Sequence, residues 1–271
     1  MQYRQEMIKR FWEYKQEYFG IRPDLFDADT PNENRPPVFL KQAAHHNVLL
    51  NPDASPQEAK AVAEAIPVRE RHRWFRSMSS SQALAQSVFG NLKASGRLHL
   101  LHGLFCEDGL PAFDDWDPSS GTVTLEQKVG HLGEPRPTSI DAFFSSSDYS
   151  IAVECKLTEQ EVGSCSRPDL TEKDPTYHQE YCDGTYRHQN GRSERCSLTQ
   201  IGVLYWRYVP NAFHWQSDAD LSPCPLNKNY QLVRNVLTVV PNGNPAKGHA
   251  ILIYDARNPA FAPEGDGWES F

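Results

Sequence analysis

The stretch that most constrains the fold of this chain is TSIDAFFSSSDYSIAVECKL, residues 138–157. Two runs rich in β-branched and aromatic residues flank a serine-rich turn, and this pattern predicts two paired strands. In the second run, alternation places Val153 and Cys155 on one face and Glu154 and Lys156 on the other. We therefore expect a strand with one buried apolar face and a Glu–Lys pair on a face open to water.

A third charged residue lies near the end of the first run. Asp141 is separated from Glu154 by twelve residues, so a neighbouring strand could bring the two carboxylates together. Close carboxylates repel unless a proton or a cation lies between them. Mg²⁺ is bound through one or two carboxylates plus substrate phosphate, and a nearby lysine can orient water or stabilise charge on that phosphate. The three residues predict a metal-assisted phosphoryl site.

The arrangement Asp-x12-Glu-Cys-Lys at Asp141, Glu154 and Lys156 resembles the PD-(D/E)XK superfamily of nucleases, also called restriction-endonuclease-like. This resemblance implies that Asp141 and Glu154 bind Mg²⁺ or Mn²⁺ and that Lys156 helps to activate the attacking water. The proline that precedes the aspartate in the family is replaced by Ile140. The alternative interpretation is a solvated strand face on which the pattern has arisen by chance.

The order of predicted elements also resembles that superfamily. We expect a helix in SSSQALAQSVFGNL, three strands from GTVTLEQKVG to YSIAVECKL, a returning helix in YQLVRNVLTVV and a last strand in HAILIYDARNP. The predicted fold is thus α/β, with a restriction-endonuclease-like core of helix, three strands, helix and strand. We predict an N-terminal helical extension (1–78), the core (79–259) with a long cysteine-containing insert at about 158–225, and a C-terminal tail (260–271).

Further polar residues are candidates for the same site. Many family members add a glutamate from the first helix, where this chain has Gln82 and Gln86. Glu126, on the first predicted strand, could substitute for it, or could simply be an exposed strand glutamate. The returning helix, with Gln231 as its candidate site residue, carries side chains that resemble a polar motif of some nuclease subfamilies: Tyr230, Gln231, Arg234 and Asn235.

Four of the six cysteines lie in the insert, at Cys165, Cys182, Cys196 and Cys224. Four thiolates can bind zinc or a [4Fe–4S] cluster, and some superfamily members carry such a cluster. An insert this polar has little core of its own, so a metal would supply folding energy that burial cannot. Their wide separation, without a CxxC pair, leaves ordinary reduced thiols as the alternative.

The segment RERHRWFRS carries a cluster of basic and aromatic residues: Arg69, Arg71, Arg73 and Arg76 around His72, Trp74 and Phe75. Arginines with aromatic rings suit contacts to a nucleic-acid backbone and stacking on bases. The alternative is an amphipathic helix whose arginines are solvated or paired. Because the net charge is −8, any DNA contact has to come from such a local patch.

Composition narrows the classes of function. No apolar run reaches membrane-spanning length and no secretory h-region is present, so a cytoplasmic protein without a membrane partner is expected. The chain also lacks a phosphate loop, a dinucleotide fingerprint and a Gly-x-Ser-x-Gly elbow. We predict a Mg²⁺-dependent nuclease acting on DNA. The alternatives are a catalytically silent nucleic-acid-binding relative, which could bind RNA, and a metal-stabilised interaction protein.

Overall fold

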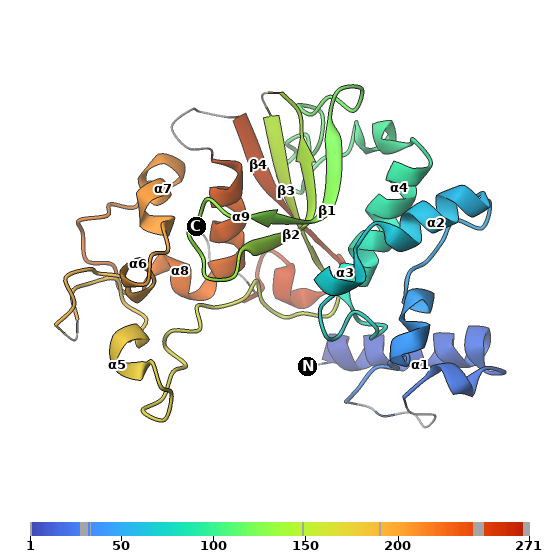
Figure 1. Ribbon diagram of the computed structural model, residues 1–271, viewed down its shortest axis with the longest axis horizontal. Coiled ribbons are helices and arrows are strands. Elements are labelled where there is room, and N and C mark those ends of the chain that lie inside the picture. Colours follow the sequence, from blue (N-terminus) through green and yellow to red (C-terminus); the bar gives the residue numbers. More distant parts are fainter. Residues whose placement is uncertain are drawn as a thin grey trace.

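A computed structural model describes residues 2–27, 32, 34–147, 149–189, 191–240 and 247–267. Its centre is a four-stranded sheet in the order β1 (Thr122–Val129), β2 (Thr138–Ser145), β3 (Tyr149–Lys156) and β4 (Lys247–Tyr254), shown in Figure 1. The first three strands are antiparallel neighbours, whereas β4 runs parallel to β3. The four predicted strands are confirmed, and the parallel pair explains the long crossover between β3 and β4.

The helices differ greatly in length. The described α-helices are α1 (Gln2–Phe19), α2 (Pro56–Glu64), α3 (Ser81–Ala85), α4 (Asn91–Ala94), α5 (Tyr177–Glu180), α6 (Ser197–Gln200), α7 (Tyr205–Ala212), α8 (Pro225–Lys228) and α9 (Tyr230–Val239). Short 3₁₀ segments cover Pro23–Leu25, Lys41–Asn47, Val68–Glu70, Leu98–Leu101 and Pro259–Phe261. Among the described helices, none has the length and apolar character needed to cross a membrane.

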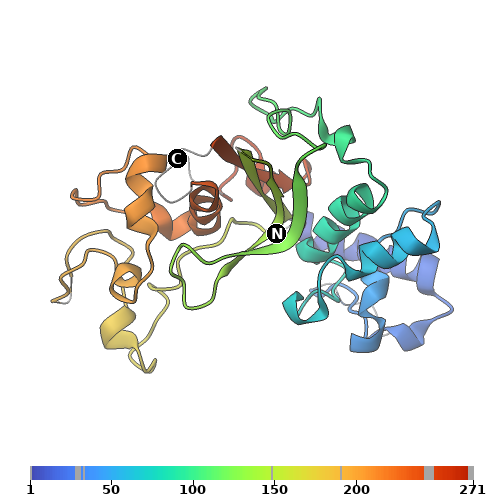
Figure 2. The same cartoon turned by 45° about the horizontal axis from the view of Figure 1, so that its top comes forward.

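Helices cover both faces of the sheet. The segment from α3 to α4 packs on one face, and α9 with α7 packs on the other (Figure 2). Strand β3 is therefore buried on both sides, and Glu154 and Lys156 are only 6% and 5% exposed. The predicted water-exposed face of this strand is wrong, because α9 covers the charged pair.

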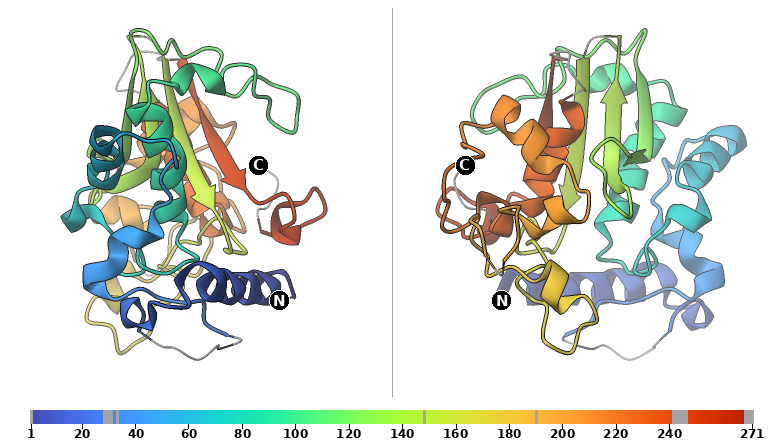
Figure 3. Two further views of the ribbon diagram at one scale, coloured as in Figure 1. Left: turned by 90° about the vertical axis from the view of Figure 1, so that its right-hand side faces the viewer. Right: turned by 60° about the vertical axis from the view of Figure 1, so that its left-hand side comes forward.

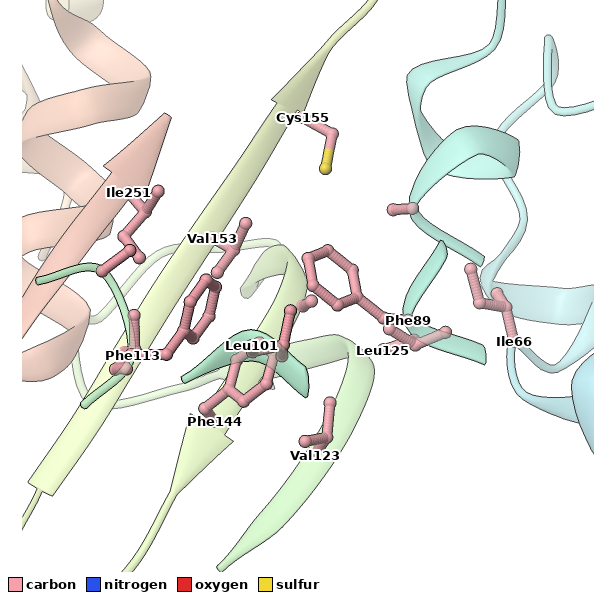
Figure 4. Close-up of a cluster of buried hydrophobic side chains, with 14 of the residues drawn as sticks. Ile66, Phe89, Leu101, Phe113, Val123, Leu125, Phe144, Val153, Cys155 and Ile251 are labelled. Carbon is pink, nitrogen blue, oxygen red and sulfur yellow. The ribbon is translucent and has the colours of Figure 1, made fainter. Parts of the chain in front are cut away.

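The larger core lies between the sheet and the helices that precede it. Phe144 of β2 is its centre, with edge-to-face contacts to Phe89 and Trp116 at ring-centroid distances of 5.5 and 5.1 Å. Val153 and Cys155 of β3 face the same cluster (Figure 4). Cys155 is thus a packing residue, as its place in the strand alternation predicts.

The β1–β2 hairpin bends along its length. Leu125 and Ala142 pack in the core just described, whereas Val129 and Ile140 pack in the opposite core with α7 and α9. Leu125 and Val129 are an even number of positions apart, and so are Ile140 and Ala142. In a straight strand pair, all four side chains would therefore point to one face. Within the described part of the chain, Glu126 is the single non-glycine residue with a positive φ, 53°. The bend therefore lies at Glu126.

The N-terminal extension closes one end of the sheet. Helix α1 lies below the sheet in both views of Figure 3, and the Tyr3 hydroxyl donates to the carbonyl of Leu157, just after β3, at 2.9 Å. Helix α2 begins with a capping box: Ser55 Oγ accepts from Glu58 N at 3.3 Å, and the Glu58 carboxylate accepts from Ser55 N at 2.7 Å. This extension thus positions α1 beside the end of β3.

Two local expectations are wrong. Helix α3 continues through a π-helical turn, Gln86–Gly90, into α4, and Val88 is 43% exposed although its helical spacing predicts burial. The wider π turn shifts the side-chain register of the helix. The segment RERHRWFRS is no continuous helix, since its 3₁₀ turn ends at Glu70 and bends follow.

Candidate active site

Three carboxylates from three neighbouring strands form one row. Glu126 lies opposite Asp141 between the pairs Leu125–Ala142 and Gln127–Ile140. Continuing the β2–β3 register beyond Ala142–Val153 places Asp141 opposite Glu154. Directly opposite residues of antiparallel strands project to the same side. The strand register thus places Asp141 beside Glu154, and Glu126 is close enough that its charge acts on Asp141 and that of Glu154 acts on it.

Asp141 lies where the pairing of β2 with β3 ends. Its Oδ2 accepts a hydrogen bond from Cys155 N at 2.8 Å, so the carboxylate takes over the place of the next ladder bond. Burial raises the pKa of Asp141 well above its usual value, and the charges of Glu154 and Glu126 raise it further. The backbone hydrogen bond offsets only part of this effect. The Asp141 carboxyl therefore favours a proton or a cation.

Glu126 is affected in the same way. Burial raises its pKa from 4.5 to about 7, and the charges of Glu154 and Glu70 act in the same direction. Hydrogen bonds from Gln82 and Ser139 oppose the rise. Gln82, a candidate from the first helix, therefore reaches this carboxylate, whereas Gln86 donates to the carbonyl of Val62 at 2.6 Å and lies outside the site.

Glu154 and Lys156 form a buried ion pair. Lys156 Nζ lies 3.0 Å from Glu154 Oε1, although the residues are only two positions apart on the strand. Burial lowers the pKa of Lys156, but the charges of Glu154, Glu159 and Asp141 together outweigh burial and raise it. Lys156 is therefore an ammonium group in this structure.

Helix α9 holds this ion pair in place. Gln231 Oε1 accepts from Lys156 Nζ at 2.6 Å, and Asn235 Nδ2 donates to Glu154 Oε2 at 3.1 Å. These two residues are four apart, so they share one helix face. Asn235 is fully buried, and its Oδ1 has no hydrogen-bond partner among the described residues. An unpaired buried amide oxygen next to Glu154 is an additional oxygen donor for a cation.

The chain after β3 passes closely over Gln231. Gly163 has φ of +74°, and a Cβ at this position would lie 2.9 Å from Gln231 Cγ and Oε1. The backbone of this segment also accepts hydrogen bonds from the start of α9, with Gly163 O 3.0 Å from Tyr230 N. Only glycine satisfies both the left-handed backbone and the close approach. The first turn of the insert thus fixes Gln231.

An open cleft reaches Lys156, the cation of this ion pair. It has a volume of about 500 Å³ and is lined by Lys156 and Gln231 together with Arg4, Glu159 and Glu161. A second hollow of about 460 Å³ shares Arg4, Thr158 and Glu159 with it. That hollow extends along residues of the N-terminal extension: Arg35, His72 and Trp74. The two hollows together form a groove that leads from Lys156 to Trp74.

The four arginines of RERHRWFRS have different environments. Arg71 donates to the carbonyls of Ala63 and Ile66 at 2.7 and 3.2 Å, and Arg76 pairs with Asp27 at 2.7 Å. Arg69 is largely exposed, and the Arg73 guanidinium lies 4.9 Å from the Trp74 ring centroid. Arg71 and Arg76 are therefore held by the protein itself. Arg69 lies 3.2 Å from Glu70 Oε1 but stays largely exposed, so Arg69 and Arg73 are the arginines of this cluster with outward-facing charge.

The carboxylates offer oxygen ligands for a divalent cation. Within the described ranges, no three His, Cys, Asp or Glu side chains stand together as a formed metal site. Hard cations nevertheless bind through as few as one or two carboxylates. Asp141 and Glu154 lie opposite each other, burial raises the pKa of Asp141, and Asn235 Oδ1 is unpartnered. This donor set consists of hard oxygens and fits Mg²⁺ or Mn²⁺.

Sequence reasoning left two site residues without a role. Asn235 belongs to the polar motif of the returning helix, and its signal is an amide at four-residue spacing from Gln231 on the same helix face. Arg4 lines the cleft from α1, more than a hundred positions before β3. No local pattern could have indicated Arg4, because only the packing of α1 brings it to the site.

The chain was compared with known proteins. A family model described as "Restriction Endonuclease associating with ARP" matches residues 15–271, which include the sheet, the insert and most of the N-terminal extension. Searches of curated proteins and of solved structures returned no match.

Proposed function

This chain belongs to the family of restriction endonucleases associating with ARP, and from that premise we propose that it is a metal-dependent nuclease of the PD-(D/E)XK type. Its reaction would be hydrolysis of phosphodiester bonds in DNA. The observation that carries the proposal is the row of Glu126, Asp141 and Glu154 beside the Lys156 ammonium. Such a row attracts a cation and then a phosphate, as phosphoryl transfer requires.

The residues have different roles in this proposal. Asp141 and Glu154 would hold Mg²⁺ or Mn²⁺, which when bound supplies Lewis acidity toward the phosphoryl oxygens. Lys156 carries a raised pKa, so it acts as an ammonium that orients water and stabilises charge developing on the phosphate. Gln231 and Asn235 position Lys156 and Glu154. Glu126, whose pKa is about 7, can hold or release a proton near neutral pH.

The groove suggests the path of a DNA strand. Trp74 is 45% exposed and lies between Arg73 and Arg35, whose guanidinium carbons are 4.9 and 6.0 Å from its ring centroid. An exposed ring flanked by arginines suits base stacking beside phosphate contacts. We propose that Trp74, Arg35 and Arg4 guide the strand toward Lys156, with Arg69 and Arg73 adding charge along the same side.

A binding protein without catalysis is the second candidate. It is favoured by the contact between Lys156 and Glu154, because the ammonium already compensates the carboxylate that would bind a metal. In that case nucleic acid would bind in the groove and remain intact. Cleavage assays with Mg²⁺ or Mn²⁺ distinguish the two candidates.

The test uses the full chain with labelled single-stranded DNA, duplex DNA and RNA. We expect Mg²⁺- or Mn²⁺-dependent cleavage of DNA, and a loss of at least about a hundredfold in Glu154→Gln and Asp141→Asn. Matched controls are Glu64→Gln and Lys60→Met, at exposed positions on α2. Calorimetric titration with Mn²⁺ adds a binding measurement that does not depend on the substrate. Wild-type protein that binds Mn²⁺ yet leaves every substrate intact would exclude the nuclease.

The family description also names an association with a partner abbreviated ARP. We extend this association to the present chain as a proposal. Co-purification of the full chain with that partner tests it. Failure to co-purify would limit the association to other members of the family.

A further inference from the structure

Four cysteines of the insert meet around one cavity, away from the carboxylates. Cys165, Cys182, Cys196 and Cys224 line a space of about 20 Å³, and all four are free thiols. A space of this size accommodates one water-sized species. It suits a single ion better than an iron–sulfur cubane. The thiols come from four separate segments, so their meeting follows from the tertiary structure alone.

The backbone around the thiols has a repeated local geometry. Cys165, Cys196 and Cys224 each accept a hydrogen bond from the backbone N–H two residues further on, at Arg167, Leu198 and Leu226. An N–H directed at sulfur stabilises a thiolate more than a thiol. The same turn at three separate places indicates that these loops are shaped to present thiolates.

The shared cavity also limits what the four thiols can hold. Cys165, Cys182, Cys196 and Cys224 all line the same small space. Thiolates held this close together repel one another unless a cation lies among them. A soft divalent metal fulfils that condition.

Two arginines lie close to the cysteines. Arg167 lines the cavity and forms an ion pair with Glu180, whereas Arg192, 8% exposed, donates to the carbonyl of Tyr181 beside Cys182. Two nitrogens of Arg192 have no hydrogen-bond partner among the described residues. A zinc ion with four thiolates carries a net charge of −2, which the Arg192 guanidinium would offset in part.

We propose that Cys165, Cys182, Cys196 and Cys224 bind one zinc ion as a structural tetrathiolate site. No group of metal-binding side chains is formed at coordination spacing in the described residues, so the loops must close on the cavity. The sulfurs would then lie about 4 Å apart, given Zn–S bonds of about 2.3 Å. Cysteines carried on loops and four-residue helices can make this movement more readily than residues of a sheet.

The zinc site would also support one wall of the cleft. Cys165 N donates to Asn227 O at 2.8 Å, and Cys224 caps α8, which leads directly into α9. The segment that ends at Cys165 contains Gly163, which contacts Gln231. Closing the four loops on one ion would therefore hold the start of α9 and, through Gln231, the Lys156 side chain.

The test begins with the full chain purified without chelator. We expect one zinc per chain by mass spectrometry, and X-ray absorption with a sulfur-only shell at about 2.3 Å. Cys182→Ser and Cys196→Ser should lose the zinc and melt at a lower temperature. Cys106→Ser, at a half-buried thiol outside the cavity, is the matched control and should change neither.

The absorption and metal measurements on wild-type protein do not require any variant to fold. Iron with acid-labile sulfide and visible absorbance would overturn the single-ion site in favour of a cluster. A chain that contains neither metal and melts at the same temperature with and without added zinc would show that the cysteines are ordinary thiols. Because zinc content is independent of cleavage, this result is separable from failure of the nuclease proposal.

Discussion

The row of carboxylates and the cysteine cavity are built in different ways. Glu126, Asp141 and Glu154 are placed by the register of three adjacent strands, and Glu154 accepts a hydrogen bond from Asn235 of α9. The cysteines lie in loops, two of them at the N-caps of four-residue helices, and their sulfurs are not at coordination spacing. The difference teaches that one site is held by backbone pairing, whereas the other depends on what binds there.

The two sites are expected to change the stability of the folded chain in opposite directions. A charged row inside a sheet costs stability, because desolvated carboxylates repel each other. A tetrathiolate in a weakly packed insert would provide stability, because the insert has little other means of folding.

The first prediction concerns the buried ion pair. Lys156→Met leaves Glu154 charged and without its ammonium partner, so we expect a loss of about 3–5 kcal/mol in the free energy of unfolding. The double variant Lys156→Met/Glu154→Gln removes both charges and should recover most of this loss, while remaining inactive. Urea denaturation without divalent ions measures the free energy of unfolding of both variants, with Lys60→Met as the control. A double variant as unstable as the single one would contradict the predicted coupling.

The second prediction concerns zinc removal. A chelator should destabilise the chain by about 3 kcal/mol relative to protein in zinc at a hundred times its dissociation constant. Hydrogen exchange should rise in the insert and at the start of α9, with little change in β2 and β3. Added Mg²⁺ should not restore the insert, since hard cations bind thiolates poorly. Uniform loss of protection across the sheet would contradict a site confined to the insert.

The third prediction follows from the pKa of Glu126. Folding raises this pKa from 4.5 to about 7, so the folded state binds the proton more tightly. The associated stability is present below pH 4.5 and is lost as the pH rises toward 7. Glu126→Gln should therefore match wild type below this window and be more stable above it. Denaturation across the range measures the difference, and equal curves at every pH would show that Glu126 is solvated.

The fourth and smallest effects are expected in the arginine cluster. Arg71→Ala removes hydrogen bonds to two carbonyls and should cost about 1 kcal/mol of stability without changing the salt dependence of DNA binding. Arg69→Ala should leave stability unchanged and lower the salt slope by about one. Melting curves measure the stability of the two variants, and salt titrations of DNA affinity measure their salt slopes. Equal salt slopes in both variants would show that the cluster is purely structural.

The strands and most of the candidate site were predictable from local patterns. Alternation in YSIAVECKL identified β3 and separated Cys155 from Glu154 and Lys156, and the helix and strand that follow the insert also lie where expected. From the sequence, Glu126 is a candidate only as a possible substitute for the glutamate that many family members carry on the first helix. Its place opposite Asp141 depends on hairpin pairing and on a positive φ that glutamate rarely adopts, and no local rule predicts this.

The sequence by itself determined which residues could form strands and which charged side chains could meet on one of them, because strand geometry repeats every two residues. Only the tertiary structure decided that α9 buries the Glu154–Lys156 pair, that Arg4 reaches the cleft, and that four distant cysteines share one cavity. Those outcomes depend on contacts between segments far apart in the chain. Such contacts are selected by the packing of the whole molecule rather than by any local preference.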